Sequence, residues 1–159
     1  MGSGKSTLGK KLANKLAYDF IDLDLAIEEQ EQLSISEIFK ERGEEYFRKA
    51  EQKALKSIAN SSKKLVIALG GGTPCFFDNM DLINQSGVSI YLKYNSGILA
   101  HRLLNAKTER PLIIEKNKEE LIDFIEKTLK EREIYYTKSK FIIEKTNVKI
   151  DDILSLIQN

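Results

Sequence analysis

The chain has 159 residues, 42% of them hydrophobic, and its 25 Lys and Arg nearly balance its 24 Asp and Glu. This length suits one domain with its own core and is too short for two ordinary domains. A net charge of +1 gives no broad basic field, which argues against nucleic acid and anionic membranes as partners and favours a small ligand. The single cysteine, Cys75, excludes an internal disulfide and a cysteine-based metal cluster. We therefore expect one cytoplasmic domain over residues 1–159, present as a monomer.

Helical and strand-like patterns alternate along the chain, which is typical of an α/β fold with helices on both faces of a parallel sheet. In chain order, the patterns predict a helix over 5–16, a strand over 20–23, a helix from Ser34 that ends at Gly43, a helix that turns Phe47, Ala50, Ala54 and Ile58 inward, a strand over 65–69, a strand over 88–92, a helix over 98–104, a charged segment over 107–117, a helix over 119–138, a strand over 141–143 and a helix over 151–157.

The start of the chain carries a phosphate-binding motif. Its residues are the second half of the pattern G-x-x-x-x-G-K-[S/T], directly before a helical segment. Glycines let backbone N–H groups point at phosphate oxygens, and the helix N-terminus adds a positive dipole end. Lys5 would reach the β- and γ-phosphates, Ser6 would bind Mg²⁺ and Thr7 would bind the α-phosphate; the alternative is a flexible start before an ordinary helix. The motif residues are Gly2, Ser3, Gly4, Lys5, Ser6 and Thr7.

The first glycine of this pattern, and the strand that should lead into the loop, would lie upstream of Met1. In doubly wound folds that strand lies near the middle of the sheet, so its absence would leave unpaired backbone groups on two neighbouring strands. We expect that the natural protein begins several residues earlier. Alternatively, another segment or a second chain fills the gap.

Two acidic residues, Asp22 and Asp24, are predicted to end a strand one helix after the motif, where alternate side chains share a face. One carboxylate could hold Mg²⁺ through water while the other takes the proton of an attacking hydroxyl. A solvated strand end is the alternative. Arg132 falls on the predicted apolar stripe of its helix and is expected to face inward, and Arg48 borders another such stripe. A buried arginine needs an anionic partner, which is either an internal carboxylate such as Glu51 or a substrate carboxylate.

Two loops complete the candidate site. Gly70-Gly71-Gly72 follows the predicted buried strand, at the sheet edge where ligands bind in such folds, although a tight turn would also use glycine. The polar stretch 107–117 is predicted to be a flap that closes over ATP. In that flap, Arg110 would bring positive charge to the transferring phosphoryl group; a solvated loop is the alternative.

In their order and spacing, these motifs resemble shikimate kinases over nearly the whole chain. The resemblance implies a three-layer kinase fold similar to the nucleoside monophosphate kinases, with a five-stranded parallel sheet whose first strand is missing here. It also implies a substrate region over about 24–58 and a lid over about 107–117. The motifs are Gly2–Thr7, Asp22-Leu23-Asp24, Phe47-Arg48-x-x-Glu51, Gly70-Gly71-Gly72, Arg110-Pro111-Leu112, and Arg132 with Tyr135 or Tyr136 after it.

The reaction that the resemblance implies is phosphorylation of shikimate by ATP with Mg²⁺, in the pathway to chorismate and the aromatic amino acids. A gluconate-type kinase and a catalytically impaired nucleotide-binding module are the alternatives. The resemblance assigns catalysis to Lys5, Asp24 and Arg110, and it assigns the metal to Ser6 and Asp22. It assigns ATP binding to Gly2–Thr7 and Arg110, with Arg102 against adenine. Shikimate would be bound by Asp24, Arg48, Gly70, Gly71, Gly72 and Arg132.

Overall fold

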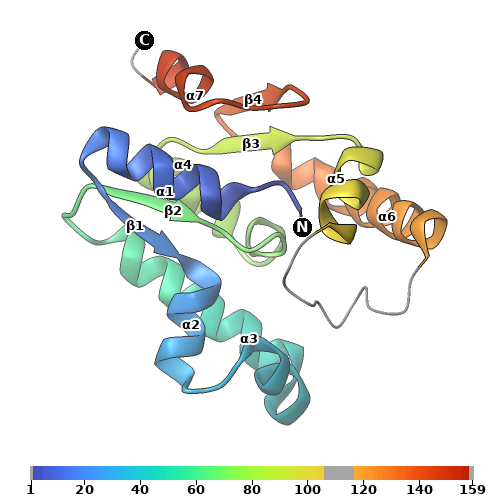
Figure 1. The fold of residues 1–159 in the computed structure, drawn as a ribbon. Helices are drawn as coiled ribbons and strands as arrows, with labels where there is room; N and C mark the ends of the chain where they lie inside the picture. Colours follow the sequence, from blue (N-terminus) through green and yellow to red (C-terminus); the bar gives the residue numbers. More distant parts are fainter. Residues whose placement is uncertain (1, 106–116, 158–159) are drawn as a thin grey trace.

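The computed structural model describes residues 2–105 and 117–157, and its helices and strands follow one another as in an α/β fold (Figure 1). This confirms the predicted fold class. The helices are α1 (Lys5–Leu16), α2 (Leu23–Glu31), α3 (Ile35–Ala59), the short 3-10 helix η1 (Thr73–Cys75), α4 (Asn79–Ser86), α5 (Ser96–Leu104), α6 (Lys118–Tyr136) and α7 (Ile150–Ile157). The strands are β1 (Asp19–Asp22), β2 (Leu65–Ala68), β3 (Ile90–Lys93) and β4 (Phe141–Glu144).

The strands form two parallel pairs rather than one continuous sheet. In the first pair β1 lies beside β2, with Asp19 opposite Leu65, and in the second β3 lies beside β4, with Ile90 opposite Phe141. Within the described residues, β2 and β3 are not paired with each other, so each keeps an edge without a strand partner. The sequence had predicted unpaired backbone groups on two neighbouring strands, and the break between the pairs agrees with that expectation.

Two hydrophobic cores hold these elements together. One lies among α1, α5, α6, β4 and α7, and i, i+4 spacing puts two of its buried leucines, Leu99 and Leu103, on one face of α5. The other lies between α2 and α3, where Leu23 and Ile27 have the same spacing. Each such fully buried side chain contributes about 1.5–3 kcal/mol. Because α1 packs on β1 and β2 and also gives Leu12 to the first core, it links the two strand pairs.

The long helix α3 changes direction where the sequence predicted a helix end. Gly43 has φ 80° and ψ 170°, outside the helical region, but the helix resumes directly after it. In the second half of α3, Phe47 and Ala54 are buried as predicted. The prediction was wrong for Ala50, which is only partly buried because Arg48 and Glu51 occupy part of the inward face. Ile58 is partly buried and packs against the second core, as predicted.

Two helices were not predicted. Leu23 was assigned to the end of a strand, but it begins α2, and α4 has no counterpart among the predicted elements. The helical spacing of Leu23 and Ile27 was not recognised in the sequence because acidic residues surround them.

Over residues 2–105 and 117–157, no helix combines the length and the apolar character that crossing a membrane requires.

Candidate active site

The phosphate-binding motif forms the N-terminus of α1, as predicted. Gly4 caps the helix with φ 78°, a left-handed conformation that glycine adopts without strain. No side chain caps this end, and the first backbone hydrogen bond of the helix runs from the Leu8 N–H to the Gly4 carbonyl at 2.9 Å. The N–H groups of the first turn therefore remain available for an anion, at the positive end of the helix dipole.

Ser6 and Asp22 meet beside this helix end, although 16 residues separate them. The Ser6 hydroxyl donates a hydrogen bond of 2.5 Å to Asp22 Oδ2, and Asp22 Oδ1 accepts from the Asp24 N–H at 3.2 Å, which caps α2. In the described part of the chain, no cluster of three or more His, Cys, Asp or Glu side chains could hold a metal. One hydroxyl and one carboxylate nevertheless fit Mg²⁺, which commonly takes few protein oxygens and fills its shell with water and phosphate.

Asp24 lies in the first turn of α2 and not at the end of a strand, so the predicted strand-face geometry was wrong. The change of element follows from the Asp22 cap, which starts the helix at Leu23. Burial raises the pKa of the Asp24 carboxyl; Lys5 opposes this shift, and the negative charges of Asp22 and Glu51 add to it. Asp24 therefore lies within electrostatic reach of the lysine of the phosphate motif and is less fully hydrated than a surface carboxylate.

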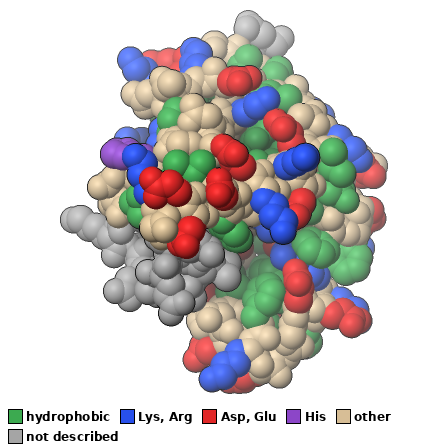
Figure 2. All heavy atoms as spheres, turned by 90° about the vertical axis from the view of Figure 1, so that its right-hand side faces the viewer, with side chains coloured by type: hydrophobic (Ala, Val, Ile, Leu, Met, Phe, Trp, Pro, Cys, Tyr) green, Lys and Arg blue, Asp and Glu red, His purple; other side chains and the backbone are tan. Residues whose placement is uncertain are grey.

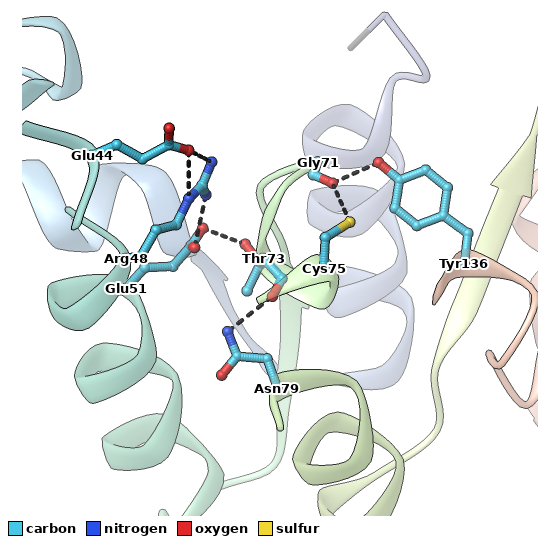
Figure 3. A network of polar contacts seen from close by, with 8 residues as sticks. All are labelled: Glu44, Arg48, Glu51, Gly71, Thr73, Cys75, Asn79 and Tyr136. Atoms are coloured by element: carbon cyan, nitrogen blue, oxygen red, sulfur yellow. Dashed lines mark hydrogen bonds and ion pairs between the residues drawn. The ribbon is translucent and has the colours of Figure 1, made fainter. Parts of the chain in front are cut away.

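Arg48 is buried in a network of carboxylates and aromatic rings (Figure 3). Its Nη1 lies 2.9 Å from Glu51 Oε2, and its Nε and Nη2 lie 3.2 and 3.1 Å from Glu44 Oε1. The guanidinium carbon is 3.9 Å from the centroid of the Phe76 ring. Since a guanidinium has five N–H donors and these contacts use three, two donors remain for a further anion.

Glu51 connects this network to the glycine turn. Its side chain is 1% exposed, and Oε1 accepts a hydrogen bond of 2.6 Å from the hydroxyl of Thr73, which is fully buried. A Cβ on Gly70 would lie 2.7 Å from Asp24 Oδ1, and a Cβ on Gly72 would lie 2.7 Å from Arg48 Nη1. The turn therefore approaches both candidate substrate-binding groups so closely that a side chain would displace them.

A methyl group at Gly72 should weaken substrate binding without abolishing the fold. In Gly72→Ala, the new Cβ would meet three guanidinium atoms of Arg48 at 2.7–3.0 Å, so Arg48 has to move. We expect the KM for the acidic substrate to rise by about tenfold or more, with the KM for ATP nearly unchanged. Gly97→Ala in α5 is the control, because its Cβ would meet nothing closer than 3.6 Å. Equal KM values in the two variants would contradict the predicted proximity of Arg48 to the substrate.

Arg132 approaches the same turn from the opposite helix. The sequence predicted a buried Arg132, and the structure shows a half-buried one, because the fully buried residues of α6, Leu121 and Ile125, lie in its first half. The positive charges of Arg132 and Arg48 both lower the pKa of the Cys75 thiol, although burial raises it overall. Both arginines therefore lie near η1, which follows the turn directly. The Tyr136 hydroxyl donates a hydrogen bond of 2.5 Å to the Gly71 carbonyl.

Arg102 and Arg110 complete the predicted set. The Arg102 guanidinium lies 4.2 Å from the centroid of the Tyr94 ring, and it donates to the carbonyls of Ser3, at 3.4 Å, and Thr146, at 3.1 Å. It is thus next to the phosphate motif. Arg110 and the predicted lid, apart from residue 117, lie outside the described residues. Figure 2 views the molecule from the right-hand side of Figure 1. It shows a hollow between the lower part of the molecule, which contains the α2–α3 connection, and the larger part above it.

Glu44, Thr73 and Tyr136 make contacts in the site but were not among the predicted site residues. Glu44 is four residues before Arg48 on one helix face, a spacing that could have indicated the pair. Thr73 follows the glycine run directly, but no sequence pattern connects it with Glu51, 22 residues away. Tyr136 was noted only as a companion of Arg132, and its contact with Gly71 spans 65 residues.

Comparisons with known proteins agree on one family. A family model described as shikimate kinase matches residues 1–159. The chain is 44% identical over 154 residues to a shikimate kinase from Azobacteroides pseudotrichonymphae, covering 97% of this chain and 91% of that protein. A crystal structure of shikimate kinase from Bacteroides thetaiotaomicron has a TM-score of 0.95 and 38% identity over 100% of this chain and 94% of its own. Shikimate kinase from Acinetobacter baumannii in complex with shikimate has a TM-score of 0.86 and 32% identity, covering 99% and 88%.

Proposed function

This chain belongs to the shikimate kinase family, and we propose that it transfers the γ-phosphoryl group of ATP to the 3-hydroxyl of shikimate, giving ADP and shikimate 3-phosphate for chorismate and aromatic amino acid synthesis. One observation carries the proposal: Asp24 and Arg48 both approach the Gly70–Gly72 turn, while the charge of Lys5 acts on Asp24. An acceptor acid held at the turn would thus lie between an anion-binding helix end and a guanidinium. The choice of shikimate as acceptor is further supported by the similarity of this chain to the shikimate kinase whose structure contains bound shikimate.

For the nucleotide, we propose that the first-turn N–H groups of α1 and the Lys5 ammonium hold the β- and γ-phosphates. Arg102, next to Ser3, would lie toward the base. Ser6 and Asp22 are the residues that would hold Mg²⁺, through a hydroxyl and a carboxylate oxygen. When bound, the ion would supply charge neutralisation on the phosphate oxygens. Arg110, from the lid region, would add positive charge to the transferring group.

For the acceptor, we propose that Asp24 accepts the proton of the attacking hydroxyl. As the oxygen bonds to the γ-phosphorus, the bond from that phosphorus to the bridging oxygen of ADP breaks, and the proton stays on the Asp24 carboxylate. The substrate carboxylate would take the two free Arg48 N–H donors and the charge of Arg132. Holding the acceptor at both ends aligns its hydroxyl with the γ-phosphate, and alignment of this kind supplies much of the rate in phosphoryl transfer.

A panel assay tests the proposal. The protein is mixed with ATP, Mg²⁺ and, separately, shikimate, gluconate or nucleoside monophosphates, and ADP release is measured. Of these acceptors, we expect only shikimate to be phosphorylated. Preferred turnover with gluconate would favour the sugar-acid alternative, and no turnover with any acceptor would favour an impaired nucleotide-binding module.

We also propose that the enzyme works as a cytoplasmic monomer without nucleic-acid or membrane partners, in line with its net charge of +1 and free Cys75 thiol.

Two variants should separate acceptor binding from chemistry. Arg132→Ala should raise the KM for shikimate by about 10- to 100-fold, because it removes one charged contact to the carboxylate, with a smaller effect on kcat. Lys5→Ala should instead lower kcat by about 100-fold or more, because its charge is needed most in the transition state. Steady-state kinetics measures both, with Lys127→Ala, an exposed site on α6, as control. The assigned roles would be contradicted by small and similar effects of both changes.

A further inference from the structure

We propose that Tyr136 is a positioning residue, which orients the Gly71–Gly72 peptide so that the Gly72 N–H faces the acceptor site. The inference rests on the proposed function for its substrate. It concerns a tie between α6 and the glycine turn that the predicted roles do not use (Figure 3).

The contact itself is short and links distant parts of the chain. The Tyr136 hydroxyl, at the last residue of α6, donates to the Gly71 carbonyl at 2.5 Å. On the other side of the turn, Thr73 donates to Glu51 at 2.6 Å. The turn is therefore held from α3 through Glu51 and from α6 through Tyr136.

Peptide geometry converts this contact into an orientation. A trans peptide is planar, and its N–H points opposite to its C=O, so a fixed Gly71 carbonyl also fixes the direction of the Gly72 N–H. That direction is away from Tyr136, toward the side of the turn where Arg48 lies (Figure 3). Among the described residues, no hydrogen bond uses the Gly72 N–H, although Gly72 is buried. An oriented, unused N–H next to a guanidinium is suited to an oxygen of an anionic acceptor.

The ring of Tyr136 is itself held in place. Its centroid lies 5.0 Å from that of Tyr91 on β3, with the rings tilted by 46°. Burial raises the pKa of the Tyr136 hydroxyl, so it stays protonated and keeps its donor role, while the nearby Arg132 charge works in the opposite direction. Arg132 and Tyr136 lie one helical turn apart, so the residue proposed to bind the acceptor and the residue proposed to orient the turn stand on the same helix.

The test compares Tyr136→Phe with Tyr135→Phe, which removes the same hydroxyl from the neighbouring residue, whose ring contacts Lys138 instead. For Tyr136→Phe we expect the KM for shikimate to rise about 3- to 10-fold, the fold-change of one neutral hydrogen bond, with kcat and the KM for ATP within about twofold. Tyr135→Phe should match the unchanged protein. A merely structural role would instead lower Tm and impair all three kinetic parameters together, and that result would overturn the proposal.

A second measurement needs no substrate. In ¹⁵N-labelled protein without ligands, the Gly72 amide resonance should shift in Tyr136→Phe and stay in place in Tyr135→Phe. An unmoved Gly72 resonance would overturn the orienting role, even where shikimate turnover is normal. If the unchanged protein does not phosphorylate shikimate, the proposed function fails, and the Gly72 resonance still decides whether Tyr136 orients the turn.

Discussion

Replacing Arg48 with alanine should lower the free energy of unfolding by about 3–5 kcal/mol and raise the KM for shikimate by 100-fold or more. The stability loss is large because Glu51, 1% exposed, would keep its charge without its nearest cation. The substrate carboxylate would lose its two guanidinium donors at the same time. Urea unfolding and steady-state kinetics measure the two effects separately.

A matched pair of variants shows whether burial causes the stability loss. Arg42→Ala removes an arginine from an ion pair with Glu31 in which the Arg42 side chain is 38% exposed, so it should cost at most about 1 kcal/mol. Glu51→Gln added to Arg48→Ala should recover part of the stability, because it removes the buried charge and keeps an acceptor for Thr73. A double variant as unstable as Arg48→Ala alone would exclude the unpaired carboxylate as the cause. The KM for shikimate should stay high both in Arg48→Ala and in the double variant.

Asp24→Asn should lower kcat by about 10²- to 10⁴-fold, the usual contribution of a general base, because an amide cannot take the proton of the attacking hydroxyl. Its shape is retained, so the KM for shikimate should change much less. The matched control is Asp19→Asn, an exposed aspartate at the other end of β1. If Asp24→Asn kept more than a tenth of the activity, another group would have to accept the proton.

The same substitution should not destabilise the protein measured without Mg²⁺ and nucleotide. Burial raises the pKa of Asp24, which means that folding disfavours its charged form. The contribution of this group to stability is therefore present below its ordinary pKa of 3.8 and is lost as the pH rises through the raised value. At pH 7–8 the neutral asparagine avoids this loss, so Tm should be equal to or higher than that of the unchanged protein. A lower Tm would indicate that the carboxylate makes stabilising contacts that asparagine cannot replace.

Local patterns predicted the elements whose signals are short-range. The bounds of α1 were predicted to the residue, because glycines, a lysine and a leucine stripe mark its start and its face. Strand and helix positions later in the chain were predicted within a few residues. The prediction of a strand at Leu23 was wrong, because capping by Asp22 starts a helix there and outweighs a short apolar run.

The site was predictable as a set of residue types but not as a geometry. Sequence order indicated that Asp24 and the glycines belong to one sheet edge, and the resemblance added Arg48; the close approaches at Gly70 and Gly72 bring all of them together. The contacts of Thr73 with Glu51 and of Tyr136 with Gly71 depend on how separate helices pack, which no local pattern encodes. The burial of Arg132 was overestimated for the same reason, since the apolar stripe of α6 continues beyond the part that the core covers.

The break between the two strand pairs has a consequence for how the protein opens. Within the described residues, backbone hydrogen bonds link β1 to β2 and β3 to β4, but none links β2 to β3. The two halves are therefore joined by side-chain packing, in which α1 takes part, and by side-chain hydrogen bonds such as that of Tyr136 with the Gly71 carbonyl. Amide protons of the two ladders can then exchange with solvent through separate local openings, and mass spectrometry in heavy water would detect two classes of protection where one continuous ladder would give one.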